Sequence, residues 1–208
     1  FSHIGVAREI AALYDKKTVL PEITINECDT PTSPLIKINI ENKDHCKRFT
    51  GRVIKNVNIK ESPEWLKKRL KSIGLKPRNN IVDITNFVMF ETGQPLHAFD
   101  FDKIRGNEII VKSAKEGDKF TTLDSKERVL NSDSLMVCDA EGYSGIAGIM
   151  GGELSEITDA TKNVFLESAY FDSVSVRKNS KKLGLQTDAS QRFERGVDVN
   201  MVEFASKR

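Results

Sequence analysis

The spacing of apolar and polar positions changes several times along this 208-residue chain. Apolar residues recur at close to the helical period in four segments, which predicts helices at 4–13, 61–75, 171–185 and 188–196. LIKINI, at residues 35–40, alternates as a half-buried strand does. Short β-like runs separated by turn residues lie at 48–59, 108–114, 119–124, 127–130, 134–140, 144–150 and 163–171. The pattern predicts an α+β fold with mixed, mostly antiparallel sheets or a barrel-like body, and flanking helices.

The helix predicted at residues 61–75 has the clearest signals. Ser62 is expected to cap it, Pro63 to lie in its first turn, and Gly74 to end it. Its apolar face is predicted to hold Trp65, Leu66, Leu70 and Ile73. The basic residues on the other face are interpreted as solvated, in preference to a role in RNA binding.

The stretch NIVDITNFVMFETGQPLHAFDFD combines a further short helix with a histidine. Asp83 or Thr85 is the predicted N-cap, and Gly93 lies just past the end. This reading places Thr85 and Asn86 at the start of the helix and His97 on the loop that follows it. Two interpretations remain open from the pattern: the rim of a pocket, or a helix cap followed by a structural turn.

Composition narrows the class of protein. Hydrophobic residues make up 38% of the chain and charged residues 30%, which fits a packed core and excludes a disordered chain. The net charge is +2, from 32 basic and 30 acidic residues, so any contact with nucleic acid must come from a local patch. No apolar run approaches the ~20 residues of a membrane span, and FSHIGVAREI lacks the apolar core of a signal peptide.

The chain is predicted to contain two parts. Residues 1–34 hold a helix with little of its own to pack on, followed by a Pro-, Thr- and Ser-rich linker, as at the end of a preceding domain. Residues 35–208 form the main domain. The first residue is Phe1, as expected of part of a longer protein. Three cysteines without CxxC spacing favour a reducing, cytoplasmic location and argue against a zinc site.

Three groups of residues are candidates for chemistry. Glu167 is the acid within the apolar run NVFLESAYF, and it lies either on a wet face or in a pocket that recognises a hydroxyl or an amine. GIAGIMGGE lacks phosphate-loop spacing and is either a backbone cradle or a β-turn. Arg177, Lys178, Lys181 and Lys182 form a weak candidate for phosphate binding. Because no nucleophile motif such as GxSxG occurs, hydrolysis would rest on a positioned water molecule.

Four runs follow one another along the chain: VDITNFVMFETGQPLHAFD, GIAGIMGGE, NVFLESAYFD and GLQTDASQRFERGVD. In this order and spacing they closely resemble the editing region of the bacterial phenylalanyl-tRNA synthetase beta subunit. The resemblance covers roughly residues 35–199. SHIGVAREIAALYDKK resembles the end of the small helical domain that precedes that region.

The resemblance implies that residues 35–208 hydrolyse tyrosyl-tRNA(Phe) made in error. It implies that Glu167 holds the tyrosine hydroxyl. The catalytic group that it implies consists of His97, Thr85 and Asn86. The other pocket residues that it implies are Gly151, Gly152, Thr187 and Ala189.

Partners and cofactors also follow from the resemblance. The implied partners are tRNA(Phe) mischarged with tyrosine and the alpha subunit of the synthetase, in a heterotetramer. ATP and magnesium would serve the parent ligase at sites outside this chain, so no cofactor or metal is expected within it, and no membrane. The alternative function is a non-catalytic module of the synthetase that binds tRNA or a partner protein.

Overall fold

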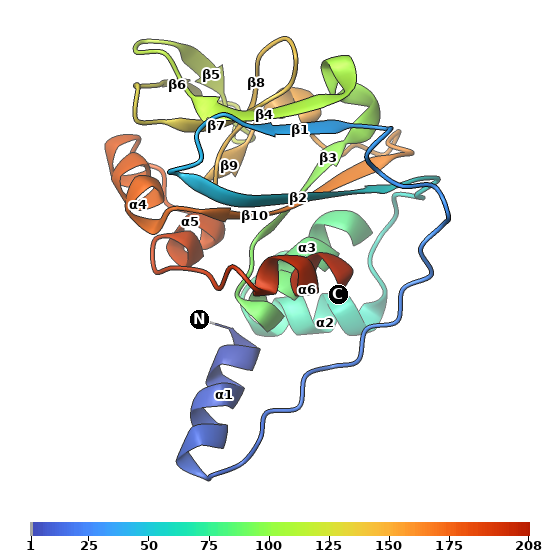
Figure 1. Ribbon diagram of the computed structural model, residues 1–208. Helices are drawn as coiled ribbons and strands as arrows, with labels where there is room; N and C mark the ends of the chain where they lie inside the picture. The colour runs from blue at the N-terminus through green and yellow to red at the C-terminus, as the bar shows by residue number, and fades with distance from the viewer. Residues whose placement is uncertain (1) are drawn as a thin grey trace.

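Two sheets that face each other form the body of the protein in the computed structural model, which describes residues 2–208 (Figure 1). The larger sheet contains, in spatial order, β1 (Lys37–Ile40), β4 (Glu108–Ser113), β7 (Leu135–Cys138), β8 (Tyr143–Ile146) and β9 (Met150–Gly151). The smaller sheet contains β2 (Cys46–Ile54), β10 (Val164–Phe171) and β3 (Leu96–Asp100). A separate hairpin joins β5 (Lys119–Thr121) to β6 (Glu127–Val129). Within residues 2–208, β1 pairs in parallel with β4, every other strand pair is antiparallel, and no sheet closes into a barrel.

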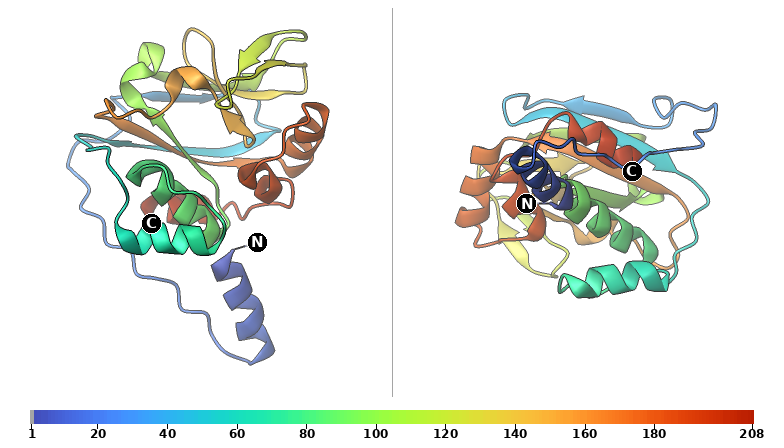
Figure 2. Two further views of the ribbon diagram at one scale, coloured as in Figure 1. Left: turned by 180° about the vertical axis from the view of Figure 1, so that it is seen from behind. Right: turned by 90° about the horizontal axis from the view of Figure 1, so that it is seen from below.

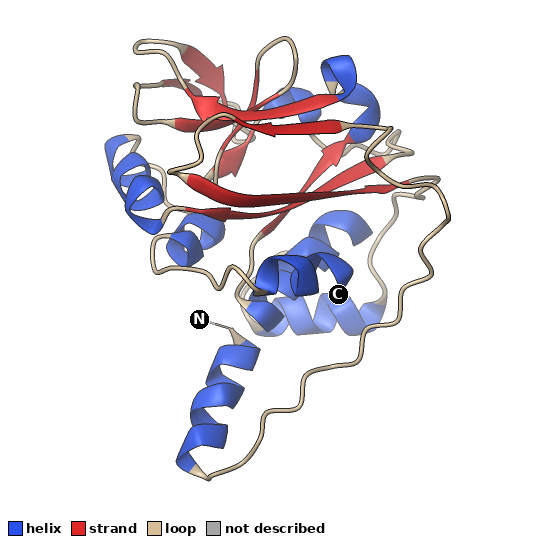
Figure 3. Ribbon diagram, in the orientation of Figure 1, coloured by secondary structure: helices blue, strands red, loops and turns tan. Residues whose placement is uncertain are grey.

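Helices cover the outer face of the smaller sheet and one edge of the molecule (Figure 3). On the outer face lie α2 (Glu64–Ser72), α3 (Asn80–Thr92) and α6 (Met201–Lys207). At the edge lie α4 (Ser173–Lys182) and α5 (Asp188–Phe193), while α1 (His3–Leu13) projects away and touches α3 (Figure 2). Short 3-10 turns lie at Phe101–Lys103, Arg105–Asn107 and Glu153–Ser155.

The hydrophobic core fills the space between the two sheets. Ile109 and Met136 of the larger sheet are fully buried, as are Phe99 and Phe165 of the smaller one. Both faces of β10 are covered, by the larger sheet on one side and by helices on the other. This double cover explains why VFLESAYF is apolar almost throughout, in contrast to the alternation of a half-exposed strand. The acid in this strand, Glu167, is therefore taken into the interior with its neighbours.

The start of α3 differs from the sequence-based prediction. Asn79 is the N-cap, and its side chain accepts hydrogen bonds from the backbone N–H groups of Ile81 and Val82 at 3.1 and 2.9 Å. Asp83 accepts bonds from other groups and does not cap. Thr85 and Asn86 therefore lie in the second turn of α3 and not at its start.

His97 was predicted on a loop, and this prediction was wrong. It is the second residue of β3, because the turn after α3 is short and the chain enters the smaller sheet at once. Gly93, at φ 84°, ends the helix as predicted.

Three further local predictions were wrong. Pro63, not Ser62, is the N-cap of α2, because the Ser62 hydroxyl donates a 2.6 Å hydrogen bond to Asp83 instead. Trp65 is 55% exposed and packs edge-to-face on Phe87, outside the core that Leu66 joins. The predicted strand at 144–150 divides into β8 and β9 around a turn.

The strand predicted around Glu167 and the helix predicted directly after it are confirmed. β10 matches the run at 163–171, and α4 lies within 171–185. Residues 14–36 contain no helix or strand. None of the helices among residues 2–208 combines the length and the apolar character that a membrane crossing requires.

Candidate functional site

The pairing of β10 with β3 brings the two main sequence candidates together. The strands are antiparallel, and Glu167 lies directly opposite His97 in their register. Residues opposite each other in an antiparallel pair project from the same face, with Cβ atoms about 4.5–5.5 Å apart. Although 69 residues separate these two positions in the chain, sheet pairing places their side chains side by side.

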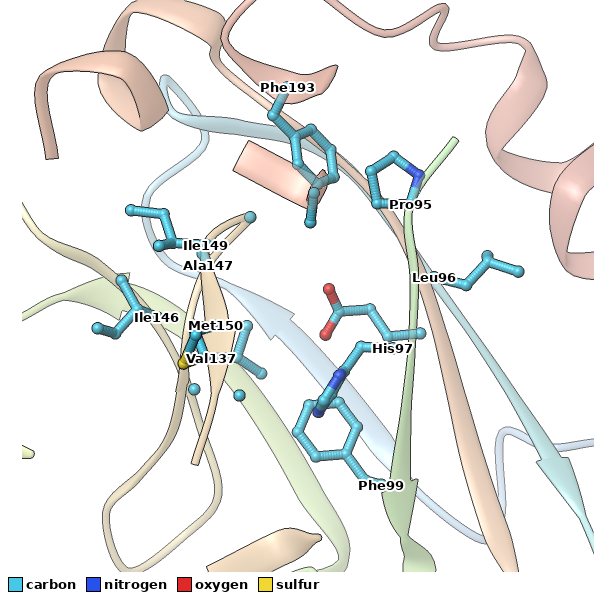
Figure 4. Close-up of a pocket in the computed structure, with 15 residues that line it drawn as sticks. Pro95, Leu96, His97, Phe99, Val137, Ile146, Ala147, Ile149, Met150 and Phe193 are labelled. Atoms are coloured by element: carbon cyan, nitrogen blue, oxygen red, sulfur yellow. The ribbon is translucent and has the colours of Figure 1, made fainter. Parts of the chain in front are cut away.

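The face that carries this pair lines a small cavity, called here the Glu167 chamber. Its volume is about 70 Å³, several times the ~10–15 Å³ that one water molecule needs, which suits a single amino-acid side chain and not a nucleotide. Figure 4 shows His97 and Phe99 on one side of it, Val137 and Met150 on the other, and Phe193 toward one end. The complete lining is Pro95, Leu96, His97, Phe99, Val137, Gly145, Ile146, Ala147, Gly148, Ile149, Met150, Gly151, Glu167, Ala189 and Phe193.

Glu167 brings a carboxyl group to an otherwise largely apolar lining. Glu167 is 8% exposed, and its carboxyl group has no hydrogen-bond or ion-pair partner among the described residues. Burial raises the pKa of this carboxyl from 4.5 to about 8. At neutral pH the group is therefore mostly protonated, so it can donate one hydrogen bond and accept others. A buried carboxyl without a partner is costly unless the chamber receives a polar group.

His97 is held by packing and not by hydrogen bonds. Its ring lies edge-to-face on Phe99, with centroids 4.4 Å apart, and has no hydrogen-bond partner among the described residues. Burial lowers the pKa of the imidazole from 6.5 to about 4. The ring is consequently neutral at pH 7, with one nitrogen free to donate and the other to accept.

Gly151 makes room for the His97 ring. A Cβ atom at Gly151 would lie 2.6 Å from both Cε1 and Nε2 of His97. This distance is far below ordinary contact, so any side chain at this position would displace the imidazole. The glycine of β9 thus sets how closely the larger sheet approaches His97.

We expect Gly151→Ala to destabilise the protein by about 1–3 kcal/mol, because the added methyl group must push the His97 ring or separate the sheets. Urea unfolding of the 208-residue chain measures this loss. Gly142→Ala is the matched control, since its Cβ would meet nothing nearer than Arg105 Nη2 at 3.5 Å. Equal stabilities for the two variants would contradict the close approach.

A second cavity, the Asn86 chamber, lies on the other side of His97. It has a volume of about 330 Å³ and is more polar than the Glu167 chamber. Leu96, His97 and Met150 line both chambers and so form the boundary between them. The remaining lining of the Asn86 chamber is Arg78, Val82, Thr85, Asn86, Ala98, Leu123, Asp124, Glu156 and Ile157. Thr85 and Asn86 thus meet His97 here and do not reach the Glu167 chamber.

Three other candidates from the sequence have different surroundings. Ala189 lines the Glu167 chamber. Thr187 does not line it, but caps α5 and donates a 2.8 Å hydrogen bond to the carbonyl of Ile149, which does. Gly152 lies behind the lining, where a Cβ would come within 2.4 Å of Phe120. Thr187 and Gly152 therefore hold the walls in place.

Several lining residues carried no sequence signal. Val137 comes from the buried strand β7 and Phe193 from α5, and each reads in the sequence as an ordinary core residue. Arg78 and Asp124 bring charge to the Asn86 chamber from segments on either side of β3. A hydrogen bond from Thr122 lowers the pKa of Asp124, and Arg128 adds to the effect. Only the tertiary structure brings these four residues to the site.

The basic candidates lie outside both chambers. Arg177, Lys178, Lys181 and Lys182 are exposed on α4. Arg177 and Lys181 line a separate cavity between α4 and α5.

Comparison with known proteins adds a family to this geometry. The B3/4 domain family matches residues 45–208. The chain is 52% identical over 198 residues to the phenylalanine–tRNA ligase beta subunit of Fusobacterium nucleatum, covering 95% of this chain and 25% of that protein. The corresponding subunit of Carboxydothermus hydrogenoformans is 50% identical over 206 residues, covering 98% of this chain and 25% of that protein. The chain thus spans about a quarter of the length of these relatives.

A solved structure shares the fold. The N-terminal fragment of the phenylalanyl-tRNA synthetase beta subunit from Pyrococcus horikoshii superposes with a TM-score of 0.50 and 18% sequence identity. The match covers 88% of this chain and 57% of that one. Family, sequence relatives and fold agree: the chain belongs to the B3/4 domain family, in the form found in phenylalanine–tRNA ligase beta subunits.

Proposed function

We propose that this chain carries out post-transfer editing within a phenylalanine–tRNA ligase, by hydrolysing the ester of tyrosyl-tRNA(Phe). The observation that carries the proposal is the buried, unpartnered carboxyl of Glu167 inside an apolar chamber beside His97. The apolar walls suit an aromatic ring, and the carboxyl suits a hydroxyl on that ring. The relatives' names supply the tRNA and the amino acid class.

Tyrosine and phenylalanine differ by one hydroxyl group, which explains the need for a second site. An apolar pocket built for phenylalanine rejects the added hydroxyl by only about a hundredfold. A site that hydrogen-bonds the hydroxyl can select tyrosine far better, because phenylalanine would leave Glu167 desolvated and unpaired at a cost of about 1–3 kcal/mol. The Glu167 chamber has this property.

The boundary between the two chambers is where the ester would lie. With the phenol ring in the Glu167 chamber, the ester reaches His97, and the rest of the substrate continues past Thr85 and Asn86. No serine or cysteine lines either chamber among the described residues, and the Thr85 hydroxyl donates a 2.8 Å hydrogen bond to the carbonyl of Val82, so water is the attacking group. Neutral His97 positions that water by hydrogen bonding, since no carboxylate orients the ring as a general base would require.

The ligase as a whole supplies the remaining parts of the reaction. The alpha subunit, ATP and magnesium would serve the synthesis of aminoacyl-tRNA outside this chain. The mischarged tRNA is then the substrate that passes to the chambers described above.

We expect His97→Ala to lower the rate of tyrosyl-tRNA(Phe) deacylation by at least tenfold, because the water loses its positioning group. Loss of the ester is followed over time with the intact ligase and with the 208-residue chain. The ratio of the wild-type rate to the His97→Ala rate should change little between pH 6 and 8, since the imidazole with a pKa of about 4 is neutral throughout that range and Glu167, with a pKa of about 8, is present in both proteins.

The control is His45→Ala, at a histidine of the loop before β2 that lines neither chamber. An unchanged rate for His97→Ala would remove this residue from the reaction. If wild-type ligase did not deacylate tyrosyl-tRNA at all, the chain would instead be a non-catalytic module that binds tRNA or a partner. Activity in the intact ligase alone would place tRNA docking outside these residues.

A further inference from the structure

The helices α4 and α5 lie at one edge of the molecule (Figure 1), and residues of α4, of the turn after it and of the end of α5 line a cavity there. It has a volume of about 640 Å³ and is largely open. Its lining is Arg177, Ser180, Lys181, Gly184, Leu185, Gln186, Glu194 and Arg195. Cations outnumber acids in this lining, and the acid Glu194 already pairs with Arg195 at 2.9 Å. The cavity therefore has a net positive field suited to an anion.

Arg177 and Lys181 are the cations that remain available in this cavity. They lie four residues apart on α4, so they project from the same face of the helix. Neither side chain has a hydrogen bond or an ion pair with any other described residue. These two side chains do not pack in the protein interior, because Val176 and Asn179 lie on the buried face of α4. Two unpaired cations at the rim of a cavity can hold one phosphate group between them.

The helix α5 connects this cavity to the Glu167 chamber. Ala189 and Phe193 face the chamber, while Glu194 and Arg195, at the C-terminal end of the same segment, line the cavity. A helix with its side chains is about 10–12 Å across. Since the substrate is proposed to leave the chambers past Thr85 and Asn86, the phosphate that reaches this cavity belongs to a nucleotide further along the RNA, and not to the nucleotide that carries the amino acid.

A second basic surface exists but is placed differently. Lys68, Arg69 and Lys71 lie on α2, which covers the outer face of the smaller sheet, away from α4 and α5 (Figure 2). That surface is on the opposite side of the sheet from the Glu167 chamber. This α2 surface is a useful comparison, because its positive charge is similar to that of the cavity lining while its position on the molecule differs.

We propose that Arg177 and Lys181 bind a backbone phosphate of the tRNA whose aminoacyl end occupies the chambers on the other side of α5. The proposal rests on the editing function proposed above for the identity of the RNA. A phosphodiester contacted in this way carries no sequence information, so its role is to hold the acceptor end in register with His97. The interaction is electrostatic and weakens as salt displaces it.

The double variant Arg177→Gln/Lys181→Gln tests this site in the full-length ligase. Binding of uncharged tRNA(Phe) is measured by fluorescence anisotropy across a range of salt concentrations. Loss of one single-strand phosphate contact should lower the slope of log affinity against log salt by about 0.7, and the affinity at 0.15 M salt by roughly tenfold. For deacylation, KM should rise by a similar factor while kcat stays the same, because the chambers are untouched.

The matched control is Lys68→Gln/Lys71→Gln on α2, which removes the same charge and should leave affinity and slope unchanged. The proposal is overturned if the α4 variant binds like the wild type, or if both variants lose affinity equally, since that indicates a diffuse field. If inorganic phosphate binds this cavity as tightly as uncharged tRNA does, the cavity is an anion site and not an RNA site. Because binding is measured with uncharged tRNA, absence of editing would leave this result readable.

Discussion

Replacing Glu167 with alanine is expected to abolish most of the preference for tyrosyl over phenylalanyl ester. The preference should fall by about 1–3 kcal/mol in transition-state free energy, which is roughly 5- to 150-fold in relative kcat/KM. The reason is that alanine removes both the hydrogen bond to the tyrosine hydroxyl and the penalty that phenylalanine incurs. Most of the change should appear as slower tyrosyl-ester hydrolysis together with faster phenylalanyl-ester hydrolysis.

The variant Glu167→Gln separates the hydrogen bond from the charge. With a pKa of about 8, the wild-type carboxyl is mostly neutral at pH 7, and a glutamine amide has the same size and can also donate and accept. We therefore expect Glu167→Gln to keep a large part of the preference at pH 7. Deacylation of both esters by the three proteins measures this, and unchanged selectivity in Glu167→Ala would rule out recognition of the hydroxyl by this residue.

The same substitution is expected to stabilise the fold at alkaline pH. The folded-state pKa of Glu167 is about 8 and its ordinary value is 4.5, so folding becomes less favourable once the unfolded chain can release a proton that the folded chain retains. The contribution of Glu167 to wild-type stability should therefore fall as pH rises from 4.5 to 8 and then level off, by an amount on the order of a few kcal/mol. Below pH 6.5 the opposite contribution of His97 offsets this fall, so the net loss of wild-type stability is expected between pH 6.5 and 8. Glu167→Gln lacks this dependence and should be more stable at pH 8, with little difference below pH 4.5.

Urea unfolding of the 208-residue chain at several pH values measures the effect. Glu9→Gln is the control, because this substitution makes the same chemical change at an exposed position of α1. His97 has the opposite effect on the pH dependence of stability. Its pKa is lowered from 6.5 to about 4, so its contribution to stability should fall as pH drops from 6.5 to 4. A wild-type stability that does not fall between pH 6.5 and pH 8 would show that Glu167 is solvated in the chamber and not buried.

The local periodicity of the sequence was sufficient for most of the helices and strands. The apolar run of β10 and the helical periods of α4 and α5 depend only on neighbouring residues, and these elements are confirmed. The prediction was wrong where two local signals competed. Asp83 could serve as a cap by its residue type, but Ser62 and the backbone of Arg78 take its carboxylate, and Asn79 caps the helix. Such a choice depends on a contact between segments about 20 residues apart, which periodicity does not contain.

The chemistry of the candidate site divides in the same way. The sequence by itself singled out Glu167 as a carboxyl within an apolar strand, and resemblance linked it to His97. Only the tertiary structure decided that β10 and β3 pair with these two residues opposite each other, because register depends on contacts between distant strands. It also decided that Thr85 and Asn86 face a second chamber, and that Gly151 gives the His97 ring its space. Residue type and spacing thus determined which groups are present, while packing between distant segments determined how they are placed and how strongly burial shifts the pKa of each.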